Sequence, residues 1–303
     1  MLSYRTIGGS SMKTIGETLR QIRVSKGLKL KDLAINDISA TFISKVERNE
    51  SNISLNKFEL LLDGLHVSYD EFKYIQNGYS QSSQKEFLEK LDYFVINEKL
   101  YGIQKLYENE KVLIPEKNPE KSLHFHNMTL ALCHIRKLQG KSLPQKYNKL
   151  LVKYLLSIDS WGIYELRLFN NAMFIFDCAS LISLTQTAID RSKYYLQLPG
   201  YSDLWSSILS NSLELLIENH EFEFAQKLLT QAEENLNFEK TTQSEIKIIF
   251  LESLIAEKQN AKPFNSPSPE DIITACYCLK AVNWADALNK YLQNWRKDTN
   301  GNS

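Results

Sequence analysis

Four side chains between residues 41 and 48 have the types and the spacing needed to hydrogen-bond the edges of nucleic-acid bases. They are Thr41, Ser44, Lys45 and Arg48, and the period of a helix places them on one side of a segment over about 40–48. Ile43 and Val46 fall on the opposite side, where a core would cover them. Lys45 is suited to read guanine, and Thr41 is suited to touch the methyl group of thymine. The pattern therefore predicts a helix that reads bases in a major groove.

A small helical domain is needed to position these side chains. The apolar spacing predicts helices over about 14–26, 31–35, 40–48, 55–65 and 69–75. Ile15, Leu19 and Ile22 form the inner stripe of the first helix, and Gly27 follows it as a left-handed cap. Ser39 is suited to cap the start of the third helix. Two short helices with a brief polar connection are typical of a helix-turn-helix unit.

Charge supports the same interpretation. The 303 residues carry no formal net charge, but residues 12–48 hold eight basic and four acidic side chains. Ala40 opens the first turn of the reading helix, and Ser39, Lys29 and Arg20 are placed to meet phosphates. A basic segment on a neutral chain suits a small DNA-binding domain joined to a second domain. The alternative is that these are solvated charges on the surface of a small domain.

The order of motifs in this segment resembles the phage-repressor class of helix-turn-helix proteins and, more narrowly, the Rgg/MutR (Rgg/GadR/MutR) family of Gram-positive transcriptional regulators. The motifs are Gly27-Leu28, Leu33-Ala34, Ser39, Ile43-Ser44-Lys45-x-Glu47-Arg48, Ile53-Ser54 and Asp70-Glu71-Phe72. The family usually has glycine after Glu-Arg. Asn49 stands there in this chain, and asparagine also tolerates a positive φ. The resemblance covers residues 13–78 closely, and the rest by pattern only.

Arg23 has two roles open to it. In the phage-repressor class, the basic residue at this position pairs with the glutamate that corresponds to Glu47, which braces the first helix against the recognition helix. The resemblance therefore implies a structural ion pair between Arg23 and Glu47. The other role is a direct contact between Arg23 and a DNA phosphate.

The whole chain is predicted to be all-α, with a five-helix helix-turn-helix domain followed by a tetratricopeptide-like α-solenoid. The expected divisions are a disordered extension (1–11), the helix-turn-helix domain (12–75), a linker (76–84) and the helical-repeat domain (85–303). Further helices are expected over 85–97, 100–112, 121–138, 144–159, 163–182, 186–198, 203–219, 222–236, 243–259, 268–281 and 284–296. The solenoid is favoured by a weak repeat, in which Phe222-x-x-Ala225-x-x-x-Leu229 recurs as Trp284-x-x-Ala287-x-x-x-Tyr291. The family resemblance implies the same architecture.

Six residues within the apolar helices of the second domain are candidates for binding a short peptide. Tyr164, Arg167, Asn171 and Phe174 follow one stripe of the predicted helix 163–182, and Asn211 and Lys247 lie on later helices. An amide both donates and accepts, and a guanidinium can clamp a carboxylate, which suits the backbone of an extended peptide. Alternatively, each of these residues caps a neighbouring helix or bridges buried water.

Other chemistry is expected to be absent. His124, His126, Cys133 and His134 lack the spacing of a metal site, and the four cysteines match no zinc or disulfide pattern. The sequence has no Walker A, G-x-G-x-x-G or G-x-S-x-G motif, so we expect neither an enzyme nor a cofactor. There is no leader and no apolar run near eighteen residues, so we expect a cytoplasmic protein without a membrane span.

These observations and the resemblance together predict a regulator that binds double-stranded promoter DNA. The expected assembly is a homodimer formed through the C-terminal helical domain, with a short signalling peptide bound on the concave face of the solenoid. Two alternatives stay open: a helical-repeat protein that sequesters a protein partner, and a regulator of this family that needs no peptide.

Overall fold

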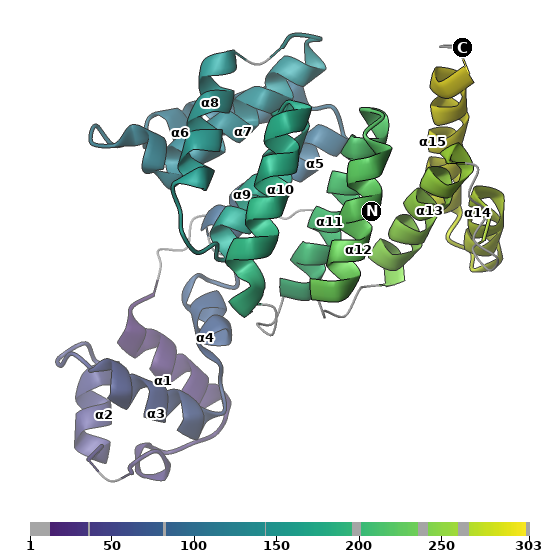
Figure 1. The fold of residues 1–303 in the computed structure, drawn as a ribbon. Helices are drawn as coiled ribbons and strands as arrows, with labels where there is room; N and C mark the ends of the chain where they lie inside the picture. Colours follow the sequence, from purple (N-terminus) through teal and green to yellow (C-terminus); the bar gives the residue numbers. More distant parts are fainter. Residues whose placement is uncertain are drawn as a thin grey trace. The chain divides into compact units, whose positions relative to one another are not determined.

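The protein is built from helices in two compact units. A computed structural model describes residues 13–300 apart from 36, 81–82, 143, 196–200, 236–241 and 260–266. These residues form fifteen α-helices and four 3₁₀ helices without a strand (Figure 1), so the predicted all-α fold is confirmed. The units are Met1–Lys99 and Leu100–Ser303. The predicted extension 1–11 lies outside the described residues, and the predicted domain boundaries stay predictions.

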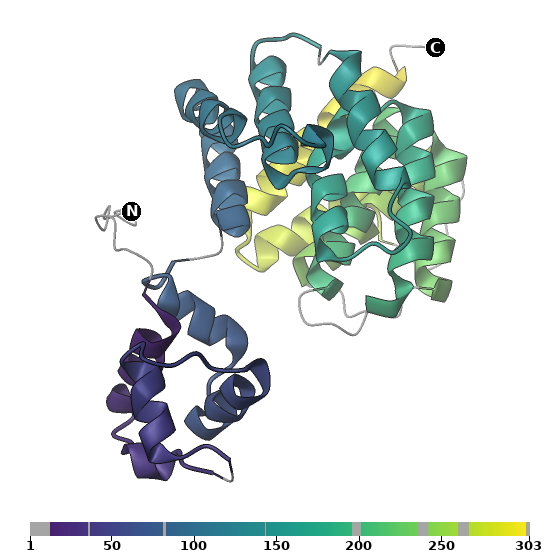
Figure 2. The same cartoon turned by 90° about the vertical axis from the view of Figure 1, so that its left-hand side faces the viewer.

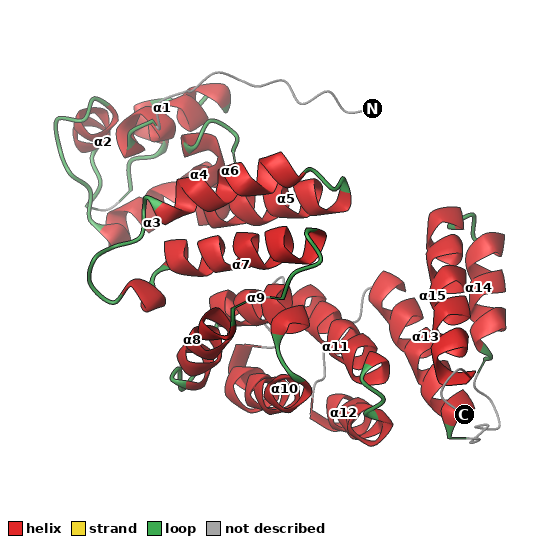
Figure 3. Ribbon diagram, turned by 90° about the horizontal axis from the view of Figure 1, so that it is seen from above, coloured by secondary structure: helices red, strands yellow, loops and turns green. Residues whose placement is uncertain are grey.

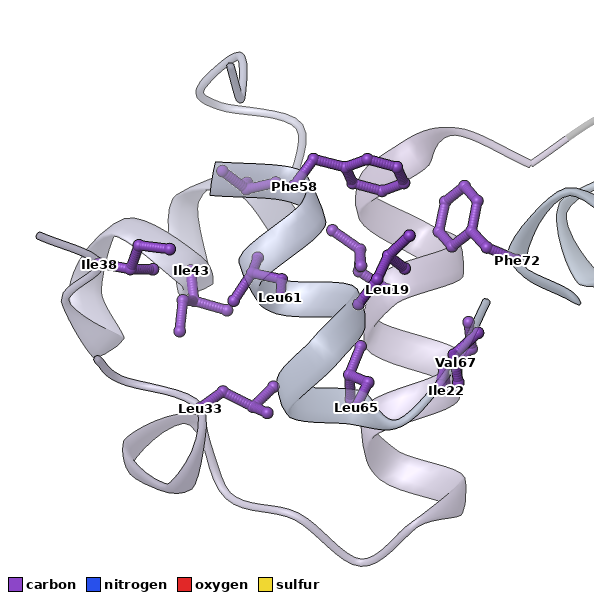
Figure 4. Packing of buried hydrophobic residues seen from close by; sticks show 12 residues of the cluster. Leu19, Ile22, Leu33, Ile38, Ile43, Phe58, Leu61, Leu65, Val67 and Phe72 are labelled. Carbon is purple, nitrogen blue, oxygen red and sulfur yellow. The ribbon is translucent and has the colours of Figure 1, made fainter. Parts of the chain in front are cut away.

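The first unit contains the predicted helix-turn-helix domain. Its helices are α1 (Ile15–Ser25), the 3₁₀ helix η1 (Leu30–Asp32), α2 (Ala40–Glu47), α3 (Leu55–Leu65), α4 (Tyr69–Gln76) and α5 (Ser83–Ile96). Helices α1 to α4, purple to blue in Figure 2, form a bundle. Its core contains Leu19, Ile22, Leu33, Ile38, Ile43, Val46, Phe58, Leu61, Leu62, Leu65, Val67 and Phe72, most of them labelled in Figure 4. Residues from every helix of the bundle contribute to this core, which fixes the orientation of α2.

Hydrogen bonds at the helix ends set the bounds of α1 and α2. Thr14 and Glu17 form a capping box at the start of α1, and the Ser39 hydroxyl accepts the N–H of Phe42 at the start of α2. Gly27 follows α1 with φ of 69°, and Asn49 follows α2 with φ of 62°. Both left-handed caps are confirmed, and an asparagine at the second one keeps the turn that glycine makes in the family.

Two details of the predicted domain are wrong. The second helix is only the three-residue 3₁₀ turn η1, because the backbone N–H and carbonyl of Ile35 bond to Ile38 instead of continuing a helix. In α1, Ile15 is 45% exposed, whereas Thr18 is fully buried. The Thr18 hydroxyl donates to the carbonyl of Thr14, so a polar residue enters the core without an unsatisfied group.

The second unit is a two-layered stack of helices. Its α-helices are α6 (Leu100–Lys111), α7 (Leu123–Leu138), α8 (Gln145–Leu156), α9 (Ile163–Ala172), α10 (Cys178–Ser192), α11 (Tyr201–Glu218), α12 (Phe222–Asn235), α13 (Thr242–Lys258), α14 (Pro269–Cys278) and α15 (Val282–Asn300), with 3₁₀ helices η2 (Pro119–Lys121), η3 (Met173–Ile175) and η4 (Lys193–Tyr195). Helices α7, α9, α11 and α13 pack side by side as an inner row, and α8, α10 and α12 lie on its outer side (Figure 3).

Two predictions for this unit are wrong. The expected helices 163–182 and 186–198 are instead α9, η3 and α10, because the Asp177 carboxylate accepts the N–H of Ser180 and starts a new helix. The second copy of the predicted repeat is also out of register. Ala225 is buried as expected, but Ala287 is exposed and Ala285 is the buried small residue of α15.

Candidate nucleic-acid interface and ligand groove

Helix α2 presents the predicted reading side chains to solvent. Ile43 and Val46 are 1% and 3% exposed and anchor the inner side of the helix in the core. Thr41, Lys45 and Arg48 are exposed, and Ser44 is half-buried. An exposed polar side opposite two buried anchors leaves these groups free to approach a nucleic acid without disturbing the core.

Arg48 makes local contacts near the end of α2. Its guanidinium forms two bonds of 2.7 Å with the Glu50 carboxylate and a third with the Ser44 hydroxyl. Both members of the ion pair are about half exposed, and exposed pairs contribute little to stability. Arg48 can therefore exchange Glu50 for a phosphate at little cost.

Arg23 and Glu47 form the ion pair that the resemblance implied. Arg23 Nε lies 2.6 Å from Glu47 Oε1, and Nη2 lies 2.8 Å from Oε2. The third nitrogen of Arg23 donates to the carbonyl of Leu28 at 2.8 Å. The two side chains are only 13% and 5% exposed. The pair thus ties α1 to the end of α2, and each of the three guanidinium nitrogens of Arg23 makes a contact within the domain.

Gly16 holds α1 and α2 together at a second point, which sequence reasoning missed. A Cβ atom on Gly16 would lie 2.1 Å from the carbonyl oxygen of Val46 and 2.8 Å from the Asn49 side chain. The backbone of α1 therefore runs directly against the end of α2. A glycine inside an amphipathic helix is the signal that could have identified this contact.

Arg20 and Lys29, two of the predicted phosphate contacts, are exposed.

A polar network lies on the inner row of the second unit. The amide of Asn211 on α11 donates to Asn170 Oδ1 on α9 at 3.1 Å and accepts from Lys247 Nζ on α13 at 3.1 Å. Lys247 also forms an ion pair of 2.6 Å with Glu214. Asn170, Asn211 and Lys247 line a cavity of about 360 Å³, together with Ser207, Ser210 and Trp284. Two of the six predicted peptide-binding residues are thus in direct contact at a cavity.

The other four predicted residues do not form one stripe. The Asn171 amide donates to the carbonyl of Arg167, one turn earlier on α9. Phe174 lies in η3, beyond the end of α9, and packs against His134 with the Lys137 ammonium 5.0 Å from its ring centre. Asn170, rather than its neighbour Asn171, contacts Asn211. Sequence spacing could not separate two adjacent asparagines whose helix ends earlier than predicted.

Tyr164 is held by a buried histidine. The Nε2–H of His126 donates to the carbonyl of Glu120 at 2.8 Å, so Nδ1 carries the lone pair that accepts the Tyr164 hydroxyl at 2.6 Å. Burial lowers the pKa of His126 to about 4, and burial likewise lowers the pKa of His134 to about 4. These histidines are neutral packing residues. Among the described residues, no cluster of three or more histidine, cysteine or acidic side chains could hold a metal.

The low pKa of His126 predicts acid sensitivity of the second unit. The pKa of this imidazole is near 6.5 in the unfolded chain and about 4 in the folded chain. Between these pH values the unfolded state binds more protons than the folded state, so the folded state loses stability as the pH falls. We expect His126 to lower the free energy of unfolding by roughly 3 kcal/mol as the pH falls from 6.5 to 4. Denaturant unfolding followed by tryptophan fluorescence measures this, because all four tryptophans lie beyond residue 160.

The matched variants are His126→Gln and His220→Asn. The first should flatten a large part of the pH dependence, since glutamine does not titrate. The second replaces an exposed histidine with φ of 61° by a residue that tolerates that conformation, and should leave the profile unchanged. Equal profiles for wild type and His126→Gln would refute the assignment.

No helix in the described part of the chain combines the length and the apolar content needed to cross a bilayer.

Several solved structures share the fold over nearly the whole chain. A protein from Listeria monocytogenes EGD-e described as a transcriptional regulator is 21% identical, with a TM-score of 0.81 and coverage of 96% of this chain and 99% of the other. The SHP pheromone receptor Rgg2 of Streptococcus dysgalactiae is 20% identical, with a TM-score of 0.77 and coverage of 92% and 99%. The complex of PrgX with cCF10 is 16% identical, with a TM-score of 0.68 and coverage of 92% and 98%.

Sequence models of two families match the two units. The model described as Helix-turn-helix matches residues 19–72, which include α2 and its exposed side chains. The model described as HTH-type transcriptional regulator Rgg, C-terminal domain, matches residues 104–290, more than half of the chain. The resemblance stated from the motifs is confirmed, and the chain belongs to the Rgg family of helix-turn-helix transcriptional regulators.

Proposed function

We propose that this regulator binds promoter DNA as a homodimer through α2 and is controlled by a short peptide bound along the inner row of its second unit. The observation that carries the peptide proposal is the network of Asn170, Asn211 and Lys247 around the 360 Å³ cavity. Amide and ammonium groups from three helices converge there, and an extended peptide offers both backbone donors and acceptors. Solved proteins of this fold include a pheromone receptor and a bacterial peptide pheromone/receptor complex, which supports the same assignment.

DNA binding would use the predicted set of side chains on and around α2. Thr41, Ser44 and Lys45 reach base edges, and Ala40 allows close approach of the first turn. Arg20, Lys29, Ser39 and Arg48 meet phosphates, whereas Arg23 acts through Glu47. Two chains would present two such helices about 34 Å apart, which matches successive major grooves. A protein that acts on bacterial promoters works in the cytoplasm.

The peptide would control DNA binding by favouring one arrangement of the two reading helices. A ligand shifts such an equilibrium only if it binds one arrangement more tightly than the other. Arg167 is the guanidinium available on α9 for a carboxylate of the peptide, and the half-buried Phe174 offers an apolar contact. Tyr164 and Asn171 would serve by shaping α9, since both already bond within the unit.

Substitution of Lys45 should separate base reading from phosphate contact. We expect Lys45→Ala to cost about 1–3 kcal/mol on the specific operator and much less on unrelated DNA. Lys29→Ala should weaken binding to all sequences alike and should lower the slope of log K against log salt by about one. Fluorescence anisotropy titrations at several salt concentrations measure both effects. Uniform weakening by Lys45→Ala would place Lys45 on the backbone instead.

The same titrations test the proposed function against a protein that sequesters a partner. A regulator binds one promoter fragment far more tightly than random DNA of equal length, and its affinity falls steeply with salt. A sequestering protein shows weak binding without preference among fragments. A regulator without a peptide ligand would bind its operator tightly and ignore every peptide.

A further inference from the structure

A second, larger hollow lies on the second unit at the C-terminal ends of α11 and α15. Its volume is about 700 Å³, and its lining includes Ile217 and Glu218 from α11 with Tyr291, Trp295, Lys297 and Asp298 from α15. Trp284, two turns before Tyr291 on α15, lines the polar cavity described above. The two cavities therefore follow one another along the same pair of helices, and Glu214 with Lys247 lies between them on α11 and α13.

Glu218 is a charged group of this hollow for which the described residues supply no ion pair. Among the ion pairs and hydrogen bonds of the described residues, none involves its side chain, and it is open to solvent within the hollow. Burial of the surrounding surface and the charge of Glu214 raise the pKa of Glu218 above its usual value. The charges of Lys137 and Lys247 oppose this rise in pKa, but Lys247 forms its ion pair with Glu214 and Lys137 lies over the ring of Phe174.

Tyr291 is a second polar side chain of this hollow. Its hydroxyl oxygen is buried and has no hydrogen-bond partner. Burial raises the pKa of Tyr291, and the negative charges of Glu214 and Glu218 raise it further. A buried polar atom without a partner is costly, and a ligand that supplies hydrogen-bond donors would relieve the cost.

The C-terminal ends of the helices favour a positively charged ligand. Carbonyl groups at the C-terminus of a helix carry partial negative charge, and α11 ends at Glu218 itself. Lys297 and Asp298 are adjacent exposed residues of opposite charge, so they nearly cancel. Trp295 contributes an aromatic wall, the best partner for an organic cation. The hollow therefore has the chemistry of a site for an ammonium group.

We propose that this hollow seats a primary ammonium group of the peptide ligand, held by the Glu218 carboxylate and the Tyr291 hydroxyl. The inference rests on the proposal that the inner row binds a peptide, and it adds the orientation. The ammonium end lies at the C-terminal ends of α11 and α15, and the backbone extends past Lys247 to the amides of Asn170 and Asn211. The ammonium can come from the peptide amino terminus or from a lysine side chain.

Three pools of synthetic heptapeptides of leucine, isoleucine, valine and phenylalanine test this site. The first pool has a free amino terminus, the second is N-acetylated, and the third is N-acetylated with one lysine at a varied position. Full-length protein is incubated with equal amounts of the pools, and the retained peptides are quantified by mass spectrometry after gel filtration. Wild type should retain one ammonium-bearing pool about tenfold better than the acetylated pool.

Isosteric variants assign that preference to the hollow. Glu218→Gln should abolish it, and Tyr291→Phe should reduce it a few-fold, with melting temperatures near that of wild type. Glu223→Gln, which neutralises an exposed carboxylate on the outer helix α12, should leave it intact. Retention without a preference for ammonium, or a preference that survives in Glu218→Gln, would overturn the inference while leaving peptide binding in place. Retention of no pool by wild type would overturn peptide binding and this site together.

Discussion

Replacing Gly16 with alanine is expected to unfold or severely loosen the helix-turn-helix domain. The new methyl group would lie 2.1 Å from the carbonyl oxygen of Val46, and this neighbour is backbone that cannot rotate away. Relief requires α1 to move off the end of α2, which we expect to cost about 3 kcal/mol or more. Hydrogen exchange of the amides in α1 and α2 measures the loss, and specific DNA binding should disappear with it.

Gly64→Ala is the matched control in the same domain. Gly64 lies inside α3, and its added methyl group would make only an ordinary contact of 3.4 Å with Leu33. Alanine is the better helix former, so this variant should be more stable by up to about 1 kcal/mol. If both variants had the same effect, the close approach of α1 to α2 would not be the cause.

Loss of the Arg23 side chain should have the second largest effect. Arg23→Ala leaves the Glu47 carboxylate, only 5% exposed, without its cation, and also frees the carbonyl of Leu28. Removing one partner of a buried pair costs about 3–5 kcal/mol. The domain should therefore lose protection from hydrogen exchange and bind DNA poorly. That result alone would not separate a structural role from a phosphate contact.

The double variant Arg23→Met, Glu47→Met separates them. Two apolar side chains of similar length can replace a buried ion pair with little loss of stability, because no charge is left unpaired. If Arg23 acts only by bracing α1 against α2, the double variant should recover both the fold and specific DNA binding. Recovery of the fold without recovery of DNA affinity would assign Arg23 a phosphate contact.

The N-terminal domain could be predicted from sequence because its signals are local. A capping serine, a glycine and an asparagine after helices, and two buried anchors on α2 are each determined by neighbouring residues. The exceptions depend on tertiary contacts. Thr18 is buried while Ile15, which was expected on the inner stripe, is exposed, and Gly16 is required by the carbonyl of a residue thirty positions later.

The cavity lined by Asn211 and Lys247 was harder to predict because its residues come from helices far apart in sequence. Asn211 and Lys247 were noticed as polar residues in apolar helices, but their contact with each other depends on how α11 packs against α13. Phe174 was predicted to lie on the same helix as Tyr164 but lies in η3, because the cap formed by Asp177 divides one apolar stretch into two helices. Tyr291 drew attention only as part of the weak repeat and Glu218 drew none, because the hollow that both residues line is formed by α11 and α15, which are far apart in sequence.

The most direct test of the regulatory account is a titration of full-length protein against promoter fragments from its own genomic neighbourhood, with and without short hydrophobic peptides encoded nearby. We expect one fragment to bind far more tightly than random DNA, with a steep dependence on salt, and one peptide to change this affinity at least several-fold. Equal affinity for every fragment, unchanged by any peptide, would contradict it.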